Sequence, residues 1–359
     1  MTQKLTFLPD LFITIPIILL LSLGIVVIYS QDPKLALQQA ILSLFGLGIY
    51  WILSWFDFGF ESRYFKYLYI GILLLLVIVF ILGVETRGSV RWIPLGFMQL
   101  QPSELAKPVL ILFLANFWAN HSSDWKNIFK SFLLILPILA LIFRQPDLGT
   151  VLTILTIWIV ILIGANVSII KLLVMGIISL ILTPLSWIVL KDYQKERILS
   201  FISPAQDPLG MGYNVIQSMI AVGSGQLLGR GLGRGTQSRL QFLPEFRTDF
   251  IFASIAEELG FIAAATVLIL YGLIIGRSFQ IISQNHRKFT NLLVFGVLGM
   301  LFFQIVVNIG MNIGVLPITG ITLPLLSYGG SSLISTLISL GIIASVARYS
   351  RQVISKNEI

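Results

Sequence analysis

The sequence predicts an all-α integral membrane protein with about ten transmembrane helices. Of its 359 residues, 56% are hydrophobic and only 11% are charged, and the mean hydropathy is +0.93. An ordinary soluble domain has roughly 25% charged residues, so a soluble core could not bury this much apolar surface. Apolar runs also recur along the whole chain, each near the length of about 20 residues that a helix needs to cross a bilayer.

Ten apolar runs, each bounded by charged residues, proline or glycine, define the predicted spans. They cover residues 10–29, 37–56, 67–84, 104–119, 129–143, 149–165, 169–190, 249–276, 291–313 and 331–347. We expect them to form a single polytopic membrane domain over residues 1–359. A loop of residues 191–248 joins the seventh and eighth spans and is too short and too glycine-rich to predict a separate domain.

The distribution of lysine and arginine predicts the orientation. The short loops and tails on one side of the predicted membrane contain twelve of these residues, whereas the short loops on the other side contain four. Because short cytoplasmic loops are enriched in lysine and arginine, we expect both termini to be cytoplasmic and the loop of residues 191–248 to lie outside.

This outer loop is basic, with seven Lys or Arg residues and four Asp or Glu residues. Two interpretations stay open. Long loops cross the membrane largely regardless of charge, so the excess can be without function. Alternatively, the loop binds an anionic ligand such as a diphosphate, which arginine can bind through two parallel hydrogen bonds.

The residue types restrict the chemistry available outside. The sequence has no cysteine, which excludes disulfides and thiol nucleophiles, and its only histidines, His121 and His286, lie in predicted cytoplasmic loops. An outer proton acceptor would therefore be a carboxylate. Asp249 is one such carboxylate, predicted in the first turn of the eighth helix, where Thr248 can cap the helix. The helix dipole and this cap already explain an acid there, so a purely structural role also stays open.

Two further acids, Glu257 and Glu258, lie roughly 12 Å beyond Asp249 along the same predicted helix, at 1.5 Å per residue. Carboxylates at that depth are costly unless they face protein or water, so we expect an internal cavity or polar partners. The helical period places Glu257 within a quadrant of Asp249 and Glu258 on the opposite side.

The start of the fourth predicted span also carries ionisable residues. Ser103 is predicted to be its N-cap, and Glu104 and Lys107 share one helix face with Lys107 about one turn inside the membrane. Lys107 is either a snorkelling lysine paired with its own glutamate or a buried cation that faces a cavity. Trp92, beside Arg91 in the preceding loop, has the character of an interfacial anchor.

Glycine and proline interrupt the pattern in two places. Residues 223–235 contain six glycines with Arg230 and Arg234 interleaved among the last four, which would let the backbone approach a phosphate. A flexible loop is an equal alternative, and no nucleotide-binding fingerprint is present. Residues 313–332 break an apolar stretch, which is tolerated at membrane depth only in protein or beside a cavity. Asp147, in the turn of residues 146–150, is predicted to belong to the same outer-facing vestibule.

Taken together, these motifs resemble the SEDS family of bacterial membrane glycosyltransferases, and the likeness covers nearly the whole chain. Leu209 within Asp207-Pro208-Leu209-Gly210, Gln217-Ser218 after Asn214, and Gln237-Ser238 leading into Phe242 to Glu245 are more similar to the elongation branch, RodA, than to the division branch, FtsW. The other matching segments are Arg91-Trp92, Gln101 to Lys107, Gln145 to Thr150, Asp192-Tyr193-Gln194 with Arg197, Leu243-Pro244-Glu245, Thr248 to Ala253, Glu257 to Gly260, Asn308-Ile309-Gly310 and Pro324 to Ser331.

The resemblance implies ten transmembrane helices and the polymerisation of lipid II on the outer face of the cytoplasmic membrane during elongation and cell-shape maintenance. The 4-hydroxyl of an N-acetylglucosamine attacks C1 of N-acetylmuramic acid and expels undecaprenyl diphosphate. The essential aspartate of the family corresponds to Asp249, the expected base or charge partner. The expected substrate-binding residues are Arg91, Trp92, Glu104, Lys107, Arg197 and Arg247, and further cavity candidates are Asp147, Gln217, Ser218, Glu257 and Ser327.

Two features of the resemblance leave room for other outcomes. The family commonly has a histidine where this chain has Arg247, so a role for that imidazole is in doubt here. A lipid II flippase would also explain broken helices and buried charges, and a non-catalytic scaffold of the cell-wall synthase is a third interpretation. Because the unusual residues cluster on the predicted outer face, we rank the polymerase first.

The resemblance also implies partners. They are lipid II, the undecaprenyl-diphosphate-linked glycan, membrane lipid and a class B penicillin-binding protein that supplies transpeptidation; no nucleic acid is expected. No organic cofactor is expected either. A divalent cation, Mg or Mn, is kept open as an aid to diphosphate departure, although no ligand cluster in the sequence identifies a metal site.

Overall fold

The computed structural model describes residues 9–58, 64–86, 89–94, 96, 99–190, 192–203, 211–239 and 242–357. Each predicted span contains a helix. These helices are α1 (Leu11–Gln31), α2 (Pro33–Leu53), α3 (Phe65–Leu82), α4 (Pro102–Ala119), α5 (Trp125–Arg144), α6 (Leu148–Gly164), α7 (Ile169–Val189), α11 (Ile251–Gln284), α12 (Lys288–Asn312) and α13 (Gly330–Asn357). The last helix continues well beyond the predicted end at residue 347.

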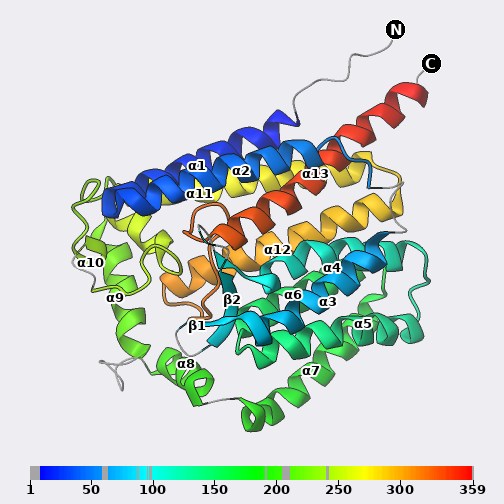
Figure 1. Cartoon of the computed structure of the whole chain (residues 1–359), viewed down its shortest axis with the longest axis horizontal. Coiled ribbons are helices and arrows are strands. Elements are labelled where there is room, and N and C mark those ends of the chain that lie inside the picture. The colour runs from blue at the N-terminus through cyan, green and yellow to red at the C-terminus, as the bar shows by residue number, and fades with distance from the viewer. Residues whose placement is uncertain are drawn as a thin grey trace.

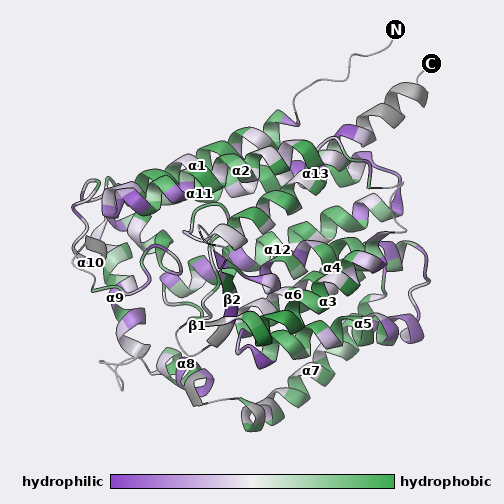
Figure 2. Cartoon of the chain, in the orientation of Figure 1, coloured by the Kyte–Doolittle hydropathy of each residue, from purple (hydrophilic) through white to green (hydrophobic). Residues whose placement is uncertain are grey.

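The helices have the composition of membrane spans. Among the described residues, α1, α2, α3, α5, α11, α12 and α13 are long and apolar enough to cross a membrane, and two shorter apolar helices lie in α6 and α7. Figure 2 shows hydrophobic residues along the helices and hydrophilic residues mostly at the ends of the bundle. The all-α membrane class is confirmed, while the number of ten crossings stays a prediction.

The start of α1 and the end of α13 lie at the same end of the bundle (Figure 1). The opposite end carries three short helices of the predicted outer loop, α8 (Asp192–Ile202), α9 (Met211–Ser224) and α10 (Thr236–Arg239). Leu209 lies outside the described residues. Between α3 and α4, the strands β1 (Val84–Thr86), β2 (Ser89–Pro94) and β3 (Gln99–Leu100) form a small antiparallel sheet that the sequence analysis did not predict.

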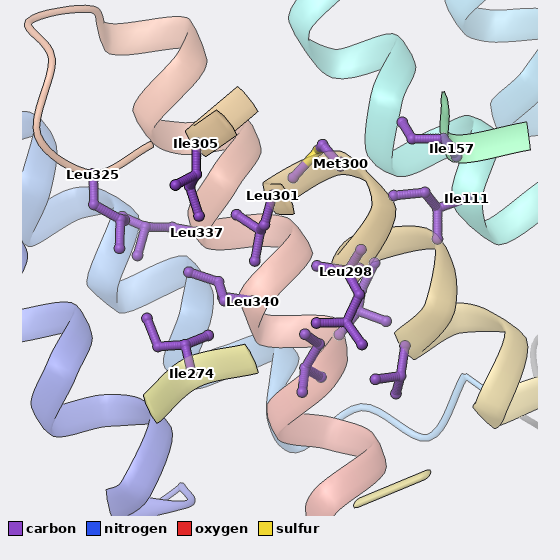
Figure 3. Packing of buried hydrophobic residues seen from close by; sticks show 14 of the residues in the cluster. Ile111, Ile157, Ile274, Leu298, Met300, Leu301, Ile305, Leu325, Leu337 and Leu340 are labelled. Carbon is purple, nitrogen blue, oxygen red and sulfur yellow. The ribbon is translucent and has the colours of Figure 1, made fainter. Parts of the chain in front are cut away.

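The centre of the bundle is formed by α12 and α13, which are the most buried of the long apolar helices. Figure 3 shows Leu298 and Leu301 of α12 near Leu337 and Leu340 of α13, with side chains from the surrounding helices beside them. The helices at the periphery of the bundle instead expose many large apolar side chains, as expected for a surface that faces lipid.

Residues 313–329 join α12 to α13 without regular structure; residues 323–327 are buried, whereas Ile313 and Val315 are exposed. We call them the broken segment. Side chains from other helices bind its carbonyl groups: Asn308 donates to Ile321 (2.7 Å), and Gln39 donates to Ser327 (3.1 Å). The expectation that this irregular backbone is buried in protein or lines a cavity is confirmed as burial in protein for residues 323–327.

Candidate functional site

Asp249 lies in the turn before α11 and not in its first helical turn. Phe250 is the N-cap of α11, and no side chain caps the helix there. The Thr248 hydroxyl instead donates to the carbonyl (3.3 Å) and the carboxylate (3.0 Å) of Glu245. The predicted cap by Thr248 and the helical placement of Asp249 are both wrong, because this turn folds back on itself before the helix begins.

Asp249 and Arg197 come together beside Gly320 of the broken segment. A Cβ atom at Gly320 would lie 3.6 Å from Asp249 Oδ2 and 3.7 Å from Arg197 Nη1. Both charged residues are half-buried, and Gly320 has a φ of 75°, which favours glycine. The fold thus unites two residues that the sequence predicted separately, one on α8 and one before α11.

The backbone of this site is held by residues to which the sequence analysis gave no role. Asn308 and Asn312 of α12 donate from their side-chain amides to the carbonyl of Asp249, at 2.9 and 3.1 Å. Ser327, a predicted cavity residue, donates to the Thr248 carbonyl at 2.6 Å. Two asparagines four residues apart inside an apolar span were a usable signal, because buried amides need partners.

The turn between α5 and α6 holds a second group of predicted residues. Asp147 caps α6 by accepting hydrogen bonds from the Thr150 amide (3.1 Å) and hydroxyl (3.0 Å), and it also accepts one from Gln101 (3.0 Å). Arg91 donates to the carbonyls of Gln145 and Pro146 in the same turn. Here Arg91 and Asp147 order the turn, and their contact with substrate stays a prediction.

This turn packs against the other side of the broken segment. A Cβ atom at Gly149 would lie 2.7 Å from the Ile321 side chain and 3.2 Å from the Thr319 carbonyl. Residues 319–321 therefore contact the turn of residues 146–150 as well as Asp249.

Of the remaining predicted residues, Trp92 on β2 and Gln217 on α9 are half-buried, and Ser218 is buried and donates to the Asn312 carbonyl at 2.9 Å.

Glu104 and Lys107 form a buried ion pair in the first turns of α4. Lys107 Nζ lies 2.8 Å from both carboxylate oxygens of Glu104. Lys107 is 2% exposed and Glu104 is 7% exposed. Pairing with its own glutamate is confirmed, whereas snorkelling of the lysine towards water is wrong. Gln101 is the N-cap of α4, so the prediction of Ser103 as the cap is also wrong.

Glu257 and Glu258 are 0% and 1% exposed, and their partners are mostly backbone and hydroxyl groups at the outer end of the bundle. Glu257 accepts hydrogen bonds from the Gln237 amide (2.9 Å) and the Thr236 hydroxyl (3.2 Å). Glu258 accepts from the Ser30 hydroxyl (2.7 Å), the Gly233 amide (3.0 Å) and Gln31 (3.3 Å). The expectation of polar partners is confirmed.

The predicted relation of Glu257 to Asp249 assumed one continuous helix, but α11 begins at Ile251, after Asp249, so that relation stays a prediction. Beyond Glu257, α11 breaks at Gly260, where φ is 76°. Residues 251–259 thus form a short helix outside the longer apolar part of α11. The loop of residues 225–233 binds its last turn, with the amides of Arg230 and Gly231 donating to the carbonyls of Glu257 and Glu258, both at 2.9 Å.

Glycines in this loop allow two backbones to approach each other. A Cβ atom at Gly229 would lie 2.3 Å from the Glu258 carbonyl, and one at Gly225 would lie 1.8 Å from the Ala256 carbonyl. The glycines at these two positions therefore serve contact within the protein, whereas the sequence analysis weighed a phosphate ligand against a flexible loop.

We expect Gly260→Ala to destabilise the protein by at least about 2 kcal/mol, because alanine disfavours positive φ and its Cβ would meet the backbone of Gly229 at 2.3 Å. Thermal unfolding of the detergent-solubilised protein measures this loss. Gly272→Ala, in the same helix with open space around it, is the control and should be neutral or slightly stabilising. Equal unfolding temperatures for the two variants would contradict the prediction.

Arg247, predicted to bind substrate, forms an ion pair with Asp32 at the turn between α1 and α2 (Nη1–Oδ2, 3.3 Å). The other carboxylate oxygen of Asp32 caps α2 by accepting from the amides of Lys34 (3.0 Å) and Leu35 (3.3 Å). This ion pair connects the turn that precedes Asp249 to the junction of α1 and α2. A role of Arg247 in substrate binding stays a prediction.

Three variants test whether Arg247 stabilises the protein through its ion pair with Asp32. If the main role of Arg247 is the ion pair, Arg247→Gln and Asp32→Asn each lower the free energy of unfolding by up to about 1 kcal/mol at low salt. The double variant then loses no more stability than either single variant. Asparagine is a good N-cap, so Asp32→Asn preserves the start of α2. Denaturant titration of the three variants measures the coupling; fully additive losses would show that the pair contributes nothing.

Among the described residues, no group of three or more His, Asp or Glu side chains is placed to hold a metal ion. Five of the carboxylates are engaged with amides, hydroxyls or basic side chains of the protein: those of Asp32, Glu104, Asp147, Glu257 and Glu258. These residues therefore do not form a protein-held metal centre of the usual kind.

The chain matches known proteins along nearly its whole length. The model of the FtsW/RodA/SpoVE family, described as cell cycle proteins, matches residues 2–352. The peptidoglycan glycosyltransferase MrdB of Escherichia coli K12 is 41% identical over 296 residues, which are 81% of this chain and 79% of MrdB. Stage V sporulation protein E of Bacillus subtilis is 36% identical over 373 aligned residues, 98% of this chain and 100% of that protein.

Solved structures agree with these matches. A chain of a peptidoglycan synthase complex, studied for the coordination of polymerization and crosslinking, has a TM-score of 0.82 and 37% identity, covering 96% of this chain and 99% of its own. The crystal structure of the rod shape-determining protein RodA of Thermus thermophilus has a TM-score of 0.72 and 32% identity, covering 95% and 97%. The chain therefore belongs to the FtsW/RodA/SpoVE family, the SEDS family of its motifs, and is a multi-pass protein of the bacterial cytoplasmic membrane.

Proposed function

We propose that this protein is a peptidoglycan glycosyltransferase that polymerises lipid II into glycan strands on the outer face of the membrane during cell elongation. Relatives that bear this enzymatic name support the proposal. The observation that carries it is the meeting of the Asp249 carboxylate and the Arg197 guanidinium beside Gly320. An acid with a cation nearby suits a reaction that moves a proton and releases an anion.

In the proposed reaction, Asp249 accepts the proton of the attacking 4-hydroxyl of an N-acetylglucosamine. The hydroxyl oxygen forms a bond to C1 of N-acetylmuramic acid, and the bond from C1 to the diphosphate oxygen breaks. Its electron pair leaves with undecaprenyl diphosphate, and Arg197 stabilises the growing negative charge. Because Lys107 is already paired with Glu104, we assign the charge stabilisation first to Arg197.

A divalent cation, Mg or Mn, that aids departure of the diphosphate remains part of the proposal; among the described residues, no group of three or more His, Asp or Glu side chains is placed to hold one. We propose a class B penicillin-binding protein as the partner. The similarity to a chain from a peptidoglycan synthase complex supports this pairing, because that complex coordinates polymerization and crosslinking.

The test is polymerisation of purified lipid II by the protein together with its penicillin-binding partner, with the products resolved as glycan strands on a gel. Strands made by the wild type, also when the partner's transpeptidase is blocked by a β-lactam, support the proposal. If no strands form while the protein moves lipid II across vesicles, it is a flippase. If it does neither yet is needed for strand synthesis by another enzyme, it is a scaffold.

A further inference from the structure

The two asparagines on α12 occupy an unusual place at the start of α11. Asn308 and Asn312 are 0% exposed, and each donates its side-chain amide to the carbonyl of Asp249, at 2.9 and 3.1 Å. The oxygen of the Asn312 side chain accepts the backbone N–H of Ala253 at 3.0 Å. Every buried polar atom in this group thus has a partner inside the bundle.

In an uninterrupted α-helix the N–H of Ala253 would donate to the carbonyl of Asp249, four residues earlier. The amide of Asn312 takes both positions of that bond, because it accepts from Ala253 and donates to Asp249. This insertion separates Asp249 from the helix and explains why α11 begins at Ile251. The Asp249 side chain is thereby directed by α12 and not by the helical period of α11.

Asn308 adds a connection to the opposite wall of the site. Its Nδ2 donates to the carbonyl of Asp249 and also to that of Ile321, at 2.9 and 2.7 Å. Ile321 follows Gly320, beside which Asp249 and Arg197 meet. One buried amide therefore fixes the backbone of Asp249 relative to the backbone next to the reacting groups.

We propose that Asn308 and Asn312 are positioning residues for the glycosyl transfer: they keep Asp249 outside α11 and facing Gly320 and Arg197. The inference rests on the proposed function. Because a displacement of about 1 Å can cost about 100-fold in rate, the loss of either amide should lower kcat about 10- to 100-fold. The KM for lipid II should change less than about threefold, since neither side chain is proposed to contact substrate.

The variant that tests this most sharply is Asn312→Leu. Leucine has the same number and branching of side-chain heavy atoms as asparagine. Its introduction frees the Ala253 amide and the Asp249 carbonyl to bond to each other, so the helix can extend while the core stays filled. Asn308→Ala is the second variant, which leaves Asn312 in place if the first does not fold. Steady-state polymerisation gives kcat and KM, and thermal unfolding gives stability.

Ser345→Ala is the matched control. In the wild type, the buried Ser345 donates one part-buried hydrogen bond from its hydroxyl to the Phe56 carbonyl. Phe56 follows the C-terminal end of α2, whereas the Asp32–Arg247 pair lies at its start. We expect this variant to lose stability to a similar extent and to keep the wild-type kcat. Unchanged kcat in a folded Asn308 or Asn312 variant, a rise in KM alone, or an equal fall of kcat in Ser345→Ala would each overturn the inference.

A second readout separates this inference from the proposed function. Hydrogen exchange of the backbone amides in residues 247–256 should change in Asn312→Leu, while exchange in residues 261–284 should not. This change is expected whether or not the wild type polymerises lipid II. A wild type without activity would therefore defeat the proposed function, whereas unaltered exchange at residues 247–256 would defeat the positioning by Asn312.

Discussion

Asp249→Asn is expected to lower kcat for lipid II polymerisation by about 10²- to 10⁴-fold, the usual contribution of a positioned general base. Asparagine retains the size of the side chain and one acceptor oxygen, but it cannot take up the proton of the attacking hydroxyl. Binding of lipid II should be little altered, because the guanidinium of Arg197 remains beside Gly320. Glycan strand formation with the penicillin-binding partner measures the loss.

Asp124→Asn provides the matched control for that experiment. Asp124 is an exposed acid in the loop before α5. The substitution Asp124→Asn makes the same chemical change as Asp249→Asn, at a position away from the proposed catalytic site. It should polymerise at the wild-type rate. An Asp249→Asn protein that is folded and active within about twofold of the wild type would rule out proton transfer to Asp249, and the family membership of the chain would be unaffected.

Glu104→Gln is expected to have the largest effect on stability, about 3–5 kcal/mol. The substitution leaves the ammonium group of Lys107, a residue only 2% exposed, without the carboxylate that lies 2.8 Å away. An isolated buried charge costs much more than the net value of the pair, because the desolvation is no longer compensated. Unfolding in detergent, followed by temperature or denaturant, measures the difference.

The double variant Glu104→Gln/Lys107→Met tests the cause of that loss. Replacing both partners of a buried pair by less polar groups of similar size is often neutral, so most of the stability should return. If the double variant is as unstable as Glu104→Gln alone, the unpaired charge is not the reason. Once folded, the double variant also reports on Lys107: a normal KM for lipid II would remove this lysine from the substrate-binding residues.

Local geometry made some features of the site predictable. Glu104 and Lys107 are three residues apart on one helix, so their contact follows from the helical repeat alone. Asp249 and Arg197 were found through motifs, and the broken segment was expected to be buried because unpaired backbone is costly in a membrane. For the ion pair the deciding interaction is close in sequence, and for the broken segment it applies to every membrane protein.

Other features depended on residues distant in sequence. The start of α11 was misplaced because Asn312, on another helix, replaces the first helical hydrogen bond at Asp249. The glycines of residues 225–229 were weighed as phosphate ligands because the sequence does not show that they face the break at Gly260. Likewise, the pairing of Arg247 with Asp32 joins two loops whose proximity no local pattern reveals.

The sequence by itself determined the membrane class, the positions of the helices and the ion pair of α4, because apolar length and helical period act within single segments. Tertiary structure alone decided where Asp249 points and which cation it meets. The physical reason is that buried polar groups must find partners, and in a packed bundle those partners come from whichever helix lies nearest. At Asp249 that helix is α12, whose two amides hold the carboxylate-bearing turn beside Gly320 and Arg197.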